Sequence, residues 1–415
     1  VNNFKIRGSW GELGNCNTTA FYPFYQTMPT GVENSGWLIN GKKPNTASAP
    51  GIVSAEMTWE TVRSWNIGFD FGLLNNRLTG SFDYFVRNTL DMIGPAPQLP
   101  ATLGATVPKV NNADMKAWGF EVEVSWRDRI KDFNYGVKFV LSDDQRKVTR
   151  YPNEELNRNQ WYAGRMDGLV WGYETVGIAK TDAEMEAHLA SLPNGGQSQL
   201  GSKWAAGDIM YKDLNGDGKI SSGDGTLNDL GDLKVVANTQ LRFKYGLTLD
   251  ASWKGFDFSA FFQGVGKRDV VVGGPYFWGA NGQGMWQAAA FKDHMDYFRP
   301  EDTESVFGPN VDAYYPRVIF GGGSSEGGKN TLTQSRYVQN GAYIRLKNLQ
   351  LGYTLPSTIT KKFAVNSLRV YVSGDNLWTG TKMRVFDPEV LGSTGDAGKA
   401  YPLARVWSVG LNVNF

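Results

Sequence analysis

One segment of the chain has the oxygen-rich spacing of a calcium-binding loop. Within residues 213–224 the first, third, fifth and twelfth positions carry side-chain oxygens, and a glycine occupies the sixth. EF-hand loops bind Ca²⁺ with this spacing and add the backbone carbonyl of the seventh position. We therefore predict a structural Ca²⁺, or a similar hard cation, whose ligands are Asp213, Asn215, Asp217, the Lys219 carbonyl and Asp224.

Two features separate this loop from a calcium-sensing helix pair. The twelfth position is Asp224, whose side chain is shorter than the glutamate that usually binds the ion with both oxygens. No helix clearly precedes the loop. The alternative is a turn in which Asp and Asn side chains accept hydrogen bonds from nearby backbone amides.

Aromatic side chains are concentrated in two long segments between the predicted strands. Flat apolar rings with polar neighbours can stack on sugars or bury a side chain of a bound peptide. Rings also dominate ordinary packing and protein interfaces, so packing is the alternative for each of them. The candidates for contact with a substrate or partner are Trp161, Tyr162, Trp171, Tyr173, Trp278 and Trp286.

Catalytic chemistry has little support in the sequence. The chain has two histidines, His188 and His294, and one cysteine, Cys16. It contains no Gly-x-Ser-x-Gly, HExxH or phosphate-binding motif in a suitable context. A single cysteine also excludes an intramolecular disulfide framework. We predict that the chain is not an enzyme and has no organic cofactor.

The elements around these candidates alternate between apolar and polar residues. Every second side chain is apolar over residues 241–253, and the alternation resumes after a turn at Lys254-Gly255. Strand side chains alternate faces, so each arm has one apolar and one polar face. The first arm has the length of about 9–11 residues that a tilted strand needs to cross a bilayer. The side chains predicted to face lipid are Phe243, Tyr245, Leu247, Leu249, Phe256, Phe258 and Phe262, and those predicted to face the lumen are Arg242, Lys244, Asp250 and Asp257.

The same alternation recurs in about ten segments, which predicts an all-β fold, an antiparallel transmembrane β-barrel. Long links follow the odd-numbered segments and short links the even-numbered ones, as in barrels with long extracellular loops and short periplasmic turns. Residues 143–236 and 267–339 are the longest predicted extracellular loops, and the second contains the one predicted helix, residues 286–298.

One predicted strand, residues 343–355, changes phase near Lys347-Asn348. A β-bulge at this point would return the later apolar side chains to the outward face. The alternative is that the first side chains of the strand face a packed interior.

Composition excludes some classes of protein. The formal net charge is +1, which gives no support for a nucleic-acid partner. No run of about 18 apolar residues is present, so no transmembrane helix is predicted. The mean hydropathy of −0.37 is compatible with a barrel, because alternating strands average out as hydrophilic. No signal peptide is recognised, and we expect the chain to be a mature or truncated product.

Several motifs resemble the SusC/RagA branch of TonB-dependent outer-membrane transporters. The longest is NGAYIRLKNLQLGYTLP at residues 340–356; shorter ones occupy residues 5–11, 314–317, 373–377, 386–390, 401–405 and 410–415. Barrels of this kind have about 22 strands and a plugged lumen. The resemblance therefore implies that residues 1–415 are the C-terminal part of a larger polypeptide.

The resemblance also implies a function and partners. It implies TonB-energised import of oligosaccharides or peptides, in which the missing N-terminal region contacts the TonB complex. A SusD-like surface lipoprotein would act as a lid, and the barrel would contact lipid in the outer membrane of a Gram-negative, Bacteroidetes-like bacterium. Two other functions stay open: a secreted β-rich protein that binds or cleaves carbohydrate, and a passive porin or adhesin barrel.

The last strand ends on an aromatic residue. Its apolar side chains, Trp407 through Phe415 at every second position, alternate with Ser408, Gly410, Asn412 and Asn414. A terminal aromatic on an alternating strand resembles the signal by which outer-membrane proteins are assembled. The candidate signal residues are Ser408, Gly410, Val413 and Phe415.

Overall fold

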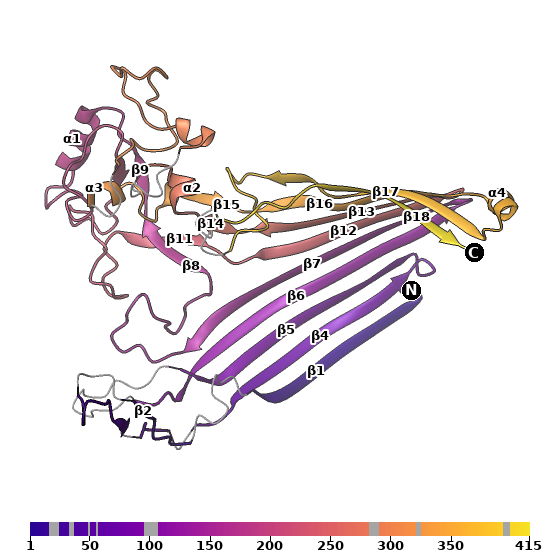
Figure 1. The fold of residues 1–415 in the computed structure, drawn as a ribbon, viewed down its shortest axis with the longest axis horizontal. Coiled ribbons are helices and arrows are strands. Elements are labelled where there is room, and N and C mark those ends of the chain that lie inside the picture. The colour runs from indigo at the N-terminus through magenta and orange to yellow at the C-terminus, as the bar shows by residue number, and fades with distance from the viewer. Residues whose placement is uncertain are drawn as a thin grey trace.

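The structure of the protein is a computed structural model, which describes residues 1–15, 25–32, 37–48, 50–54, 57–94, 107–281, 290–320, 325–392 and 399–415. An open antiparallel sheet of ten long strands forms one part of the described chain. The long connections gather at one end of this sheet, and both chain termini lie at the other end (Figure 1). Among the described residues, no helix is both long enough and apolar enough to cross a membrane.

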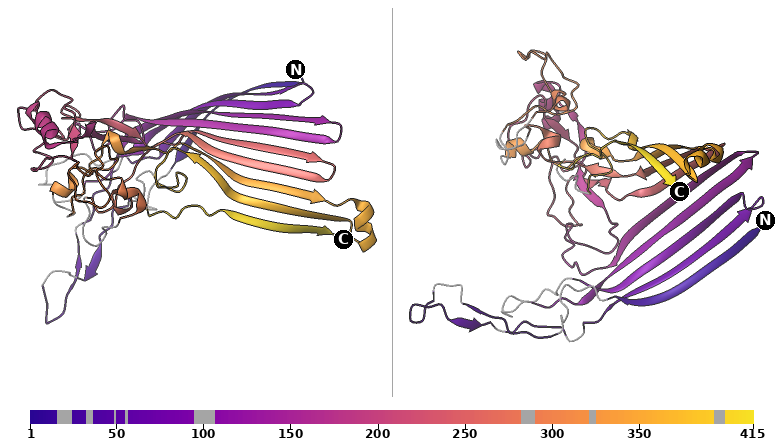
Figure 2. Two further views of the ribbon diagram at one scale, coloured as in Figure 1. Left: turned by 90° about the horizontal axis from the view of Figure 1, so that it is seen from above. Right: turned by 45° about the vertical axis from the view of Figure 1, so that its right-hand side comes forward.

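Neighbouring strands of the sheet follow one another along the chain, so the sheet is a meander. Short connections follow β4, β6, β12 and β16 at one end, whereas the long connections lie at the other (Figure 2). This arrangement confirms the predicted ten strands and the alternation of their links. The strands are β1 (Asn3–Asn15), β4 (Glu60–Leu73), β5 (Leu78–Ile93), β6 (Asn111–Ile130), β7 (Phe133–Arg150), β12 (Arg242–Trp253), β13 (Phe256–Lys267), β16 (Tyr343–Thr354), β17 (Ser367–Thr381) and β18 (Val406–Asn414).

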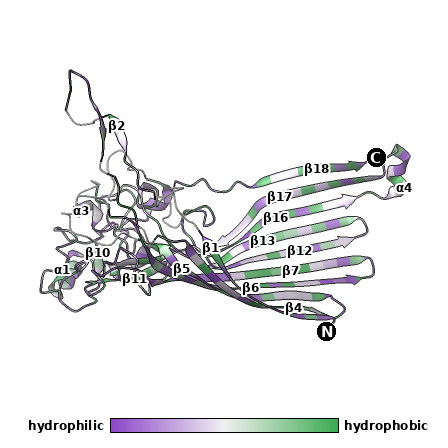
Figure 3. Ribbon diagram, turned by 90° about the horizontal axis from the view of Figure 1, so that it is seen from below, coloured by the Kyte–Doolittle hydropathy of each residue, from purple (hydrophilic) through white to green (hydrophobic). Residues whose placement is uncertain are grey.

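The pairing register collects apolar side chains on one face of the sheet. Leu247 of β12 lies opposite Phe139 of β7 and Phe262 of β13. Asp250 lies opposite Ser259, on the other face. We call the face of Leu247 the outer face and the face of Asp250 the inner face. Figure 3 shows the resulting alternation of hydrophobic and hydrophilic bands along the strands.

The register agrees with the predicted division of residues 245–262 between two faces. The exception is Phe243, whose φ of 55° interrupts the regular strand at its loop end. Regular alternation of faces requires extended backbone, and a left-handed residue does not provide it.

The predicted bulge in β16 is present. Phe261 of β13 pairs with Asn348, whereas the next residue, Phe262, pairs with Leu346. Lys347 is therefore an extra residue on β16, and the pairing with β17 shifts at the same level. The bulge returns Leu349 to the outer face, where it pairs with Ala260.

Charge pairs cross neighbouring strands on the inner face. Arg7 of β1 donates to Asp70 of β4 and Asp83 of β5, with N–O distances of 2.8–3.0 Å. Gly68 lies between the partners, and a Cβ there would be 2.3 Å from a carboxylate oxygen of Asp83. Glycine at this position makes room for the charge pair.

The connections after β7, β13 and β17 pack together, and we call their described residues 151–241, 268–342 and 382–392 the loop layer. Its core includes the fully buried side chains of Ile209, Tyr211, Val270 and Phe277. Figure 1 shows these elements beyond one end of the sheet. They are β8 (Leu169–Tyr173) paired with β11 (Leu233–Asn238), β9 (Thr175–Ile178) with β10 (Ile209–Tyr211), β14 (Asp269–Val271) with β15 (Val338–Asn340), α1 (Asp182–Ala190), α2 (Pro275–Trp278), α3 (Ser325–Gly328), and the 3₁₀ turns η2 (Lys292–Met295) and η3 (Ser335–Tyr337).

Two further parts of the chain lie outside this layer. The connection after β1 contains a small hairpin of β2 (Thr30–Val32) and β3 (Asn45–Ala47), which projects away from the sheet (Figure 2). The turn between β16 and β17 contains α4 (Ser357–Thr360) and η4 (Lys361–Phe363).

The prediction of a single helix over residues 286–298 was wrong in the part that the structure describes. Residues 282–289 lie outside the described residues, and η2 is followed by extended segments in which Tyr297 and Arg299 bridge to Tyr315 and Asn310. Pairing with another segment of the same connection replaces the helix. The longest described helix is instead α1, whose N-cap Thr181 accepts a hydrogen bond from the Glu184 amide at 3.1 Å.

Candidate functional site

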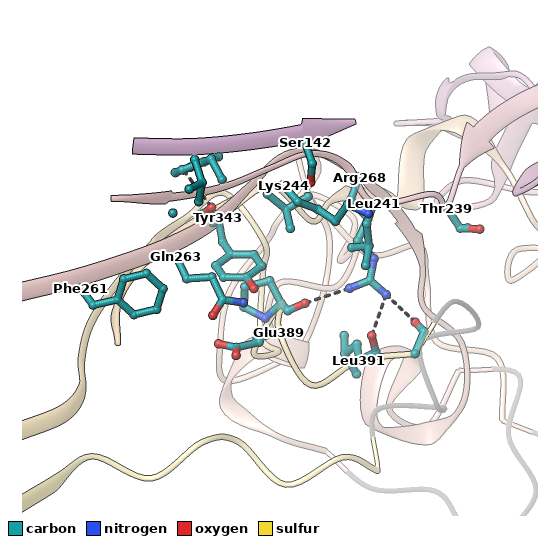
Figure 4. A pocket seen from close by; sticks show the side chains of 17 residues that line it. Ser142, Thr239, Leu241, Lys244, Phe261, Gln263, Arg268, Tyr343, Glu389 and Leu391 are labelled. Carbon is teal, nitrogen blue, oxygen red and sulfur yellow. Dashed lines mark hydrogen bonds between the residues drawn. The ribbon is translucent and has the colours of Figure 1, made fainter. Parts of the chain in front are cut away.

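A cavity of about 660 Å³ lies on the inner face, at the end of the sheet next to the loop layer (Figure 4). Its volume is within the range of small-ligand sites. We call this cavity the inner-face pocket. Strands β7, β12, β13 and β16 form one side, and the connection after β17 forms the other; the principal lining side chains are Val140, Ser142, Leu241, Lys244, Phe261, Gln263, Tyr343, Glu389 and Leu391.

The strands bring these side chains together because of the sheet register. Val140, Gly246 and Gln263 are consecutive partners across β7, β12 and β13, and Gln263 pairs with Arg345 of β16. Gly246 contributes no side chain to this row. Val140 and Phe261 approach the position that a Cβ of Gly246 would occupy to 3.0 and 3.2 Å, so a glycine here lets these side chains line the pocket wall.

The pocket is polar at its edges and apolar along parts of its wall. Lys244 forms an ion pair of 2.8 Å with Asp144, and it also borders a smaller cavity of about 240 Å³ lined by Asp83, Glu121 and Glu123. The rings of Tyr245, Phe261 and Tyr343 also line the inner-face pocket. The arrangement suits binding of a ligand that has both polar groups and apolar faces.

Arg268, which directly follows β13, orders the far wall of the pocket. Its guanidinium donates to the carbonyl oxygens of Pro388 at 2.9 Å, Leu391 at 2.6 Å and Gly392 at 2.9 Å. The dashed lines in Figure 4 mark these bonds. A backbone segment without regular structure is thereby fixed against the end of the sheet.

Acidic side chains of the same segment bind the inner face of β16. Arg345 lies 2.6 Å from Asp387 and 2.7 Å from Glu389, and Lys347 lies 2.8 Å from Glu389. Burial alone would raise the pKa of Asp387. Hydrogen bonds from the Glu389 amide and the Arg345 guanidinium outweigh that effect and lower its pKa. Asp387 therefore stays ionised at neutral pH.

The predicted calcium loop forms a series of turns closed by its own side chains. Asp213 accepts hydrogen bonds from the Gly216 amide at 2.6 Å and the Gly218 amide at 2.9 Å. Burial alone would raise the pKa of Asp213, but these bonds lower it. Asn215, Asp217 and Asp224 accept from the amides of Asp217, Lys219 and Thr226, respectively.

This geometry is the turn that the sequence left open as the alternative. In the part of the chain that the structure describes, no three His, Cys, Asp or Glu side chains group as a metal site would require. No observation tests cation binding itself, so the calcium site stays a prediction.

The candidate aromatic residues lie in different environments. Tyr173 and Trp278 are buried in the core of the loop layer, where Trp278 contacts Tyr337 with a ring-centroid distance of 4.6 Å. Trp161 remains 38% exposed and packs beside Tyr151. Packing thus accounts for the two buried rings, and Trp161 is accessible to a ligand or partner.

The other three candidates are less informative. The guanidinium of Arg165 lies 5.9 Å from the centre of the Tyr162 ring. Trp171 is part of β8 and is partly buried. Trp286 lies outside the described residues, as does Cys16.

Three of the C-terminal candidates lie on β18, which pairs with β17 in the described sheet, and Phe415 directly follows the end of β18 at Asn414. Ser408 lies opposite Ser373, and Val413 opposite Leu368. Gly410 lies under the ring of its partner Tyr371, and a Cβ there would be 2.2 Å from the ring. Phe415 is 87% exposed at the short-turn end (Figure 1). The assembly-signal role remains a prediction.

Sequence reasoning missed the binding roles of Arg268, Arg345 and Glu389. The last two lie within motifs quoted above only for their resemblance to a family. A signal was available, because residues 343–349 carry three positions with Arg, Lys or Asn and residues 386–390 carry two acids. Nothing in the sequence indicates that these two motifs are neighbours in space.

Comparison with protein families and curated proteins gives consistent matches. Residues 1–377 match the family model described as "TonB dependent receptor-like, beta-barrel". The chain is 26% identical to TonB-dependent receptor P3 of Formosa agariphila, covering 100% of this chain and 40% of that protein. It is 23% identical to TonB-dependent receptor SusC of Bacteroides thetaiotaomicron, covering 100% of this chain and 38% of that protein. The chain thus spans about two fifths of the length of these relatives.

Solved structures agree with this result at the level of the fold. A chain of the RagAB peptide transporter matches with a TM-score of 0.69 and 22% identity, covering 99% of this chain and 41% of that one. The "open-open" state of the RagAB peptide importer matches with a TM-score of 0.69 and 21% identity, covering 100% and 40%. The relatives are named receptors, transporters and importers, which agrees with the prediction that the chain is not an enzyme.

Proposed function

The chain belongs to the TonB dependent receptor-like β-barrel family, and on that premise we propose that it is the C-terminal part of an outer-membrane nutrient transporter. The proposed cargo is an oligosaccharide or a peptide. It would pass along the inner face of the barrel, and no bond would be made or broken.

The observation that carries this proposal is the division of the sheet into two chemically different faces. Outer-face side chains such as Ile67 and Leu351 are 52% and 55% exposed, which is costly in water and favourable in lipid. The inner face carries charge pairs and the inner-face pocket. A wall of this kind separates lipid from a polar passage.

The relatives support the proposed partners and location. SusC and RagAB lie in the branch that the motifs resemble, for which we propose a SusD-like surface lipoprotein as lid and the TonB complex as energy source. We place the whole protein in the outer membrane of a Bacteroidetes-like bacterium. Chain segments outside residues 1–415 would supply the contact with TonB.

Uptake measurements in the native host test this proposal. The gene for the full-length protein would be deleted and restored, and uptake of two fluorescent probe sets measured: short peptides, and neutral oligosaccharides. We expect deletion to abolish uptake of one set, and a protonophore to do the same in the restored strain. Equal uptake of both sets with and without the gene would overturn the proposal. Uptake that depends on the gene but persists with the protonophore would indicate a passive barrel.

A further inference from the structure

A ten-residue segment after β17 contacts both the loop layer and the inner face of the sheet. We call residues 383–392 the strap. Its side chains Met383 and Leu391 are 8% and 4% exposed and belong to the core of the loop layer. The strap lies along the inner-face pocket and supplies Pro388 and Glu389, from between these two anchors, and Leu391 and Gly392, from its end, to the pocket wall.

Charge pairs reinforce the attachment of the strap to the loop layer. Arg384 donates to Asp293 at 2.9 and 3.1 Å and to Asp296 at 3.0 Å. Its guanidinium also lies 4.1 Å from the ring centre of Tyr314. The start of the strap is therefore held by both apolar and ionic contacts.

The middle of the strap contacts β16 through ion pairs, and the hydrogen bond from Arg268 to the Pro388 carbonyl adds a contact at the end of β13. Asp387 and Glu389 meet Arg345, which is 3% exposed, and Glu389 also meets Lys347. Lys347 is the extra residue of the β16 bulge. The bulge therefore carries one of the cations that bind the strap, in addition to correcting the phase of the strand.

We propose that the strap is a charge-latched wall of the inner-face pocket, which regulates access to that pocket and couples it to the loop layer. With the pairs to Arg345 and Lys347 made, the wall is closed. When they are broken, the strap stays anchored in the loop layer and swings away from β16, which opens the pocket. The inference rests on the proposed function only in treating this pocket as part of the cargo path.

Two physical arguments support a latch of this kind. Removing the carboxylates leaves Arg345 buried without its ionic partners, which strongly disfavours the closed arrangement. The strap also lacks backbone pairing with the sheet, so opening it breaks no strand ladder. An incoming anionic group of a cargo molecule could replace Glu389 at the same cations, because both present carboxylate-like oxygens.

Accessibility of the pocket to a thiol reagent tests the latch without any cargo. In the full-length protein, purified in detergent, Cys16→Ser would remove the native thiol of residues 1–415, any further cysteine would be replaced by serine, and Ser142→Cys would place a thiol in the pocket wall. The rate of labelling by a charged, membrane-impermeant maleimide is then measured. We expect Asp387→Asn with Glu389→Gln to raise that rate roughly tenfold or more, which corresponds to about 1.4 kcal/mol or more.

The inner face offers a matched control. Asp257 pairs with Arg369 across the strands in a more exposed ionic contact, and neither residue lines the inner-face pocket. Asp257→Asn should leave the labelling rate within about twofold. Lys347→Gln removes only one partner of Glu389 and should give an intermediate rate, so it serves as the milder test if the double variant fails to assemble.

Only protein that migrates as a folded barrel before heating is compared. Equal labelling rates in the wild type, the double variant and Lys347→Gln would overturn the latch. A rise in the Asp257→Asn control equal to that of the strap variants would overturn it as well, because general loosening of the barrel would then suffice. Since neither cargo nor TonB is present, these outcomes are independent of the uptake experiment.

Discussion

The ten-strand sheet and the loop layer are stabilised by different kinds of contact. In the sheet, each strand pairs with the strand next to it in sequence, and many outer-face side chains are exposed. In the loop layer, regular strands are short and the side chains of distant segments are fully buried. Tyr211 and Phe277, both 0% exposed, lie in one core although they belong to different connections.

The difference follows from the solvent that each part is proposed to meet. Lipid accepts apolar side chains, so strands in a bilayer need backbone pairing more than a hydrophobic core. The connections lie in water, which does not accept apolar side chains, so they must bury apolar surface against one another. The two parts also differ in their ion pairs: the Arg7–Asp70 pair of the sheet stays part-exposed on the inner face, whereas the Lys329–Asp208 pair of the loop layer is completely buried.

The largest effect is expected from breaking the buried charge cluster of the loop layer. Asp208, which is 0% exposed, lies 2.7 Å from Arg317 and 3.0 Å from Lys329, also 0% exposed. Asp208→Ala would leave two cations without their shared partner and destabilise the layer by about 3–5 kcal/mol. Limited proteolysis of the full-length protein should show faster cleavage within residues 151–342, while the barrel stays folded.

The same comparison has an internal control. Asp312 pairs with Lys180 but is 79% exposed, and surface pairs contribute about 0–1 kcal/mol. Asp312→Ala should therefore leave the cleavage rate nearly unchanged. Loss of the folded barrel in Asp208→Ala would contradict the idea that the loop layer and the sheet are stabilised separately.

A charge on the outer face should have the next largest effect, this time on the sheet. Leu247→Arg places a cation at the middle of β12, and it should destabilise the barrel by roughly 2–4 kcal/mol if it lies near the bilayer midplane. Ser259→Arg on the inner face, opposite Asp250, is the matched control and should have little effect. Denaturant unfolding of full-length protein in lipid vesicles would measure both. Equal effects would mean that the two faces meet the same solvent.

The same contrast explains which parts of the fold could be predicted from the sequence. The strands could be predicted where one face meets lipid, since the period of two is then unbroken, as in residues 245–253. The ends of β5, β6 and β7 extended beyond the predicted segments, into residues such as Arg87, Lys116 and Asp144. The end of β7 is almost entirely polar, Asn88 interrupts the apolar series of β5, and Met115 of β6 is out of phase with Trp118, so no continuous hydrophobic period marks these ends.

The loop layer was predicted far less well, and the candidate site with it. Its core joins residues more than 100 positions apart, such as Tyr211 and Gln334, which no local pattern relates. Helix α1 did carry a local signal, Thr181 followed three residues later by Glu184, and that signal was overlooked. The charges that bind the strap to β16 become neighbours only once the register of the sheet is known.

Calcium binding is expected to stabilise the loop layer, by less than the substitutions above change stability. If Asp213 and Asp217 bind Ca²⁺ with an affinity of about 10⁻⁴–10⁻³ M, then Ca²⁺ at ten times that concentration should stabilise the loop by about 1.4 kcal/mol. Proteolysis near residues 213–224 should slow in calcium relative to EDTA. Asp213→Asn should abolish the difference. Identical cleavage with and without calcium would leave the turn closed by its own side chains as the complete explanation.

The smallest effect on the folded protein is expected at the C-terminus. Phe415 is 87% exposed and lies at the short-turn end of β18. Within an assembled barrel it would contribute one ring at the membrane interface, so its deletion should change denaturant stability by less than Leu247→Arg does.

Its expected effect on assembly is much larger, because the terminal aromatic resembles the signal of outer-membrane proteins. In the full-length protein, deletion of Phe415 should strongly reduce the amount of folded barrel in outer-membrane fractions. Phe415→Tyr keeps a terminal ring and should restore assembly, whereas Phe415→Leu keeps only apolar volume and should not. If Leu restores assembly as well as Tyr does, the residue acts through packing alone. The last strand must close the barrel, because an open edge leaves backbone groups unpaired in lipid, which is costly. An unchanged yield of folded barrel in the deletion variant would therefore show that this closure needs Phe415 neither as a signal nor for packing.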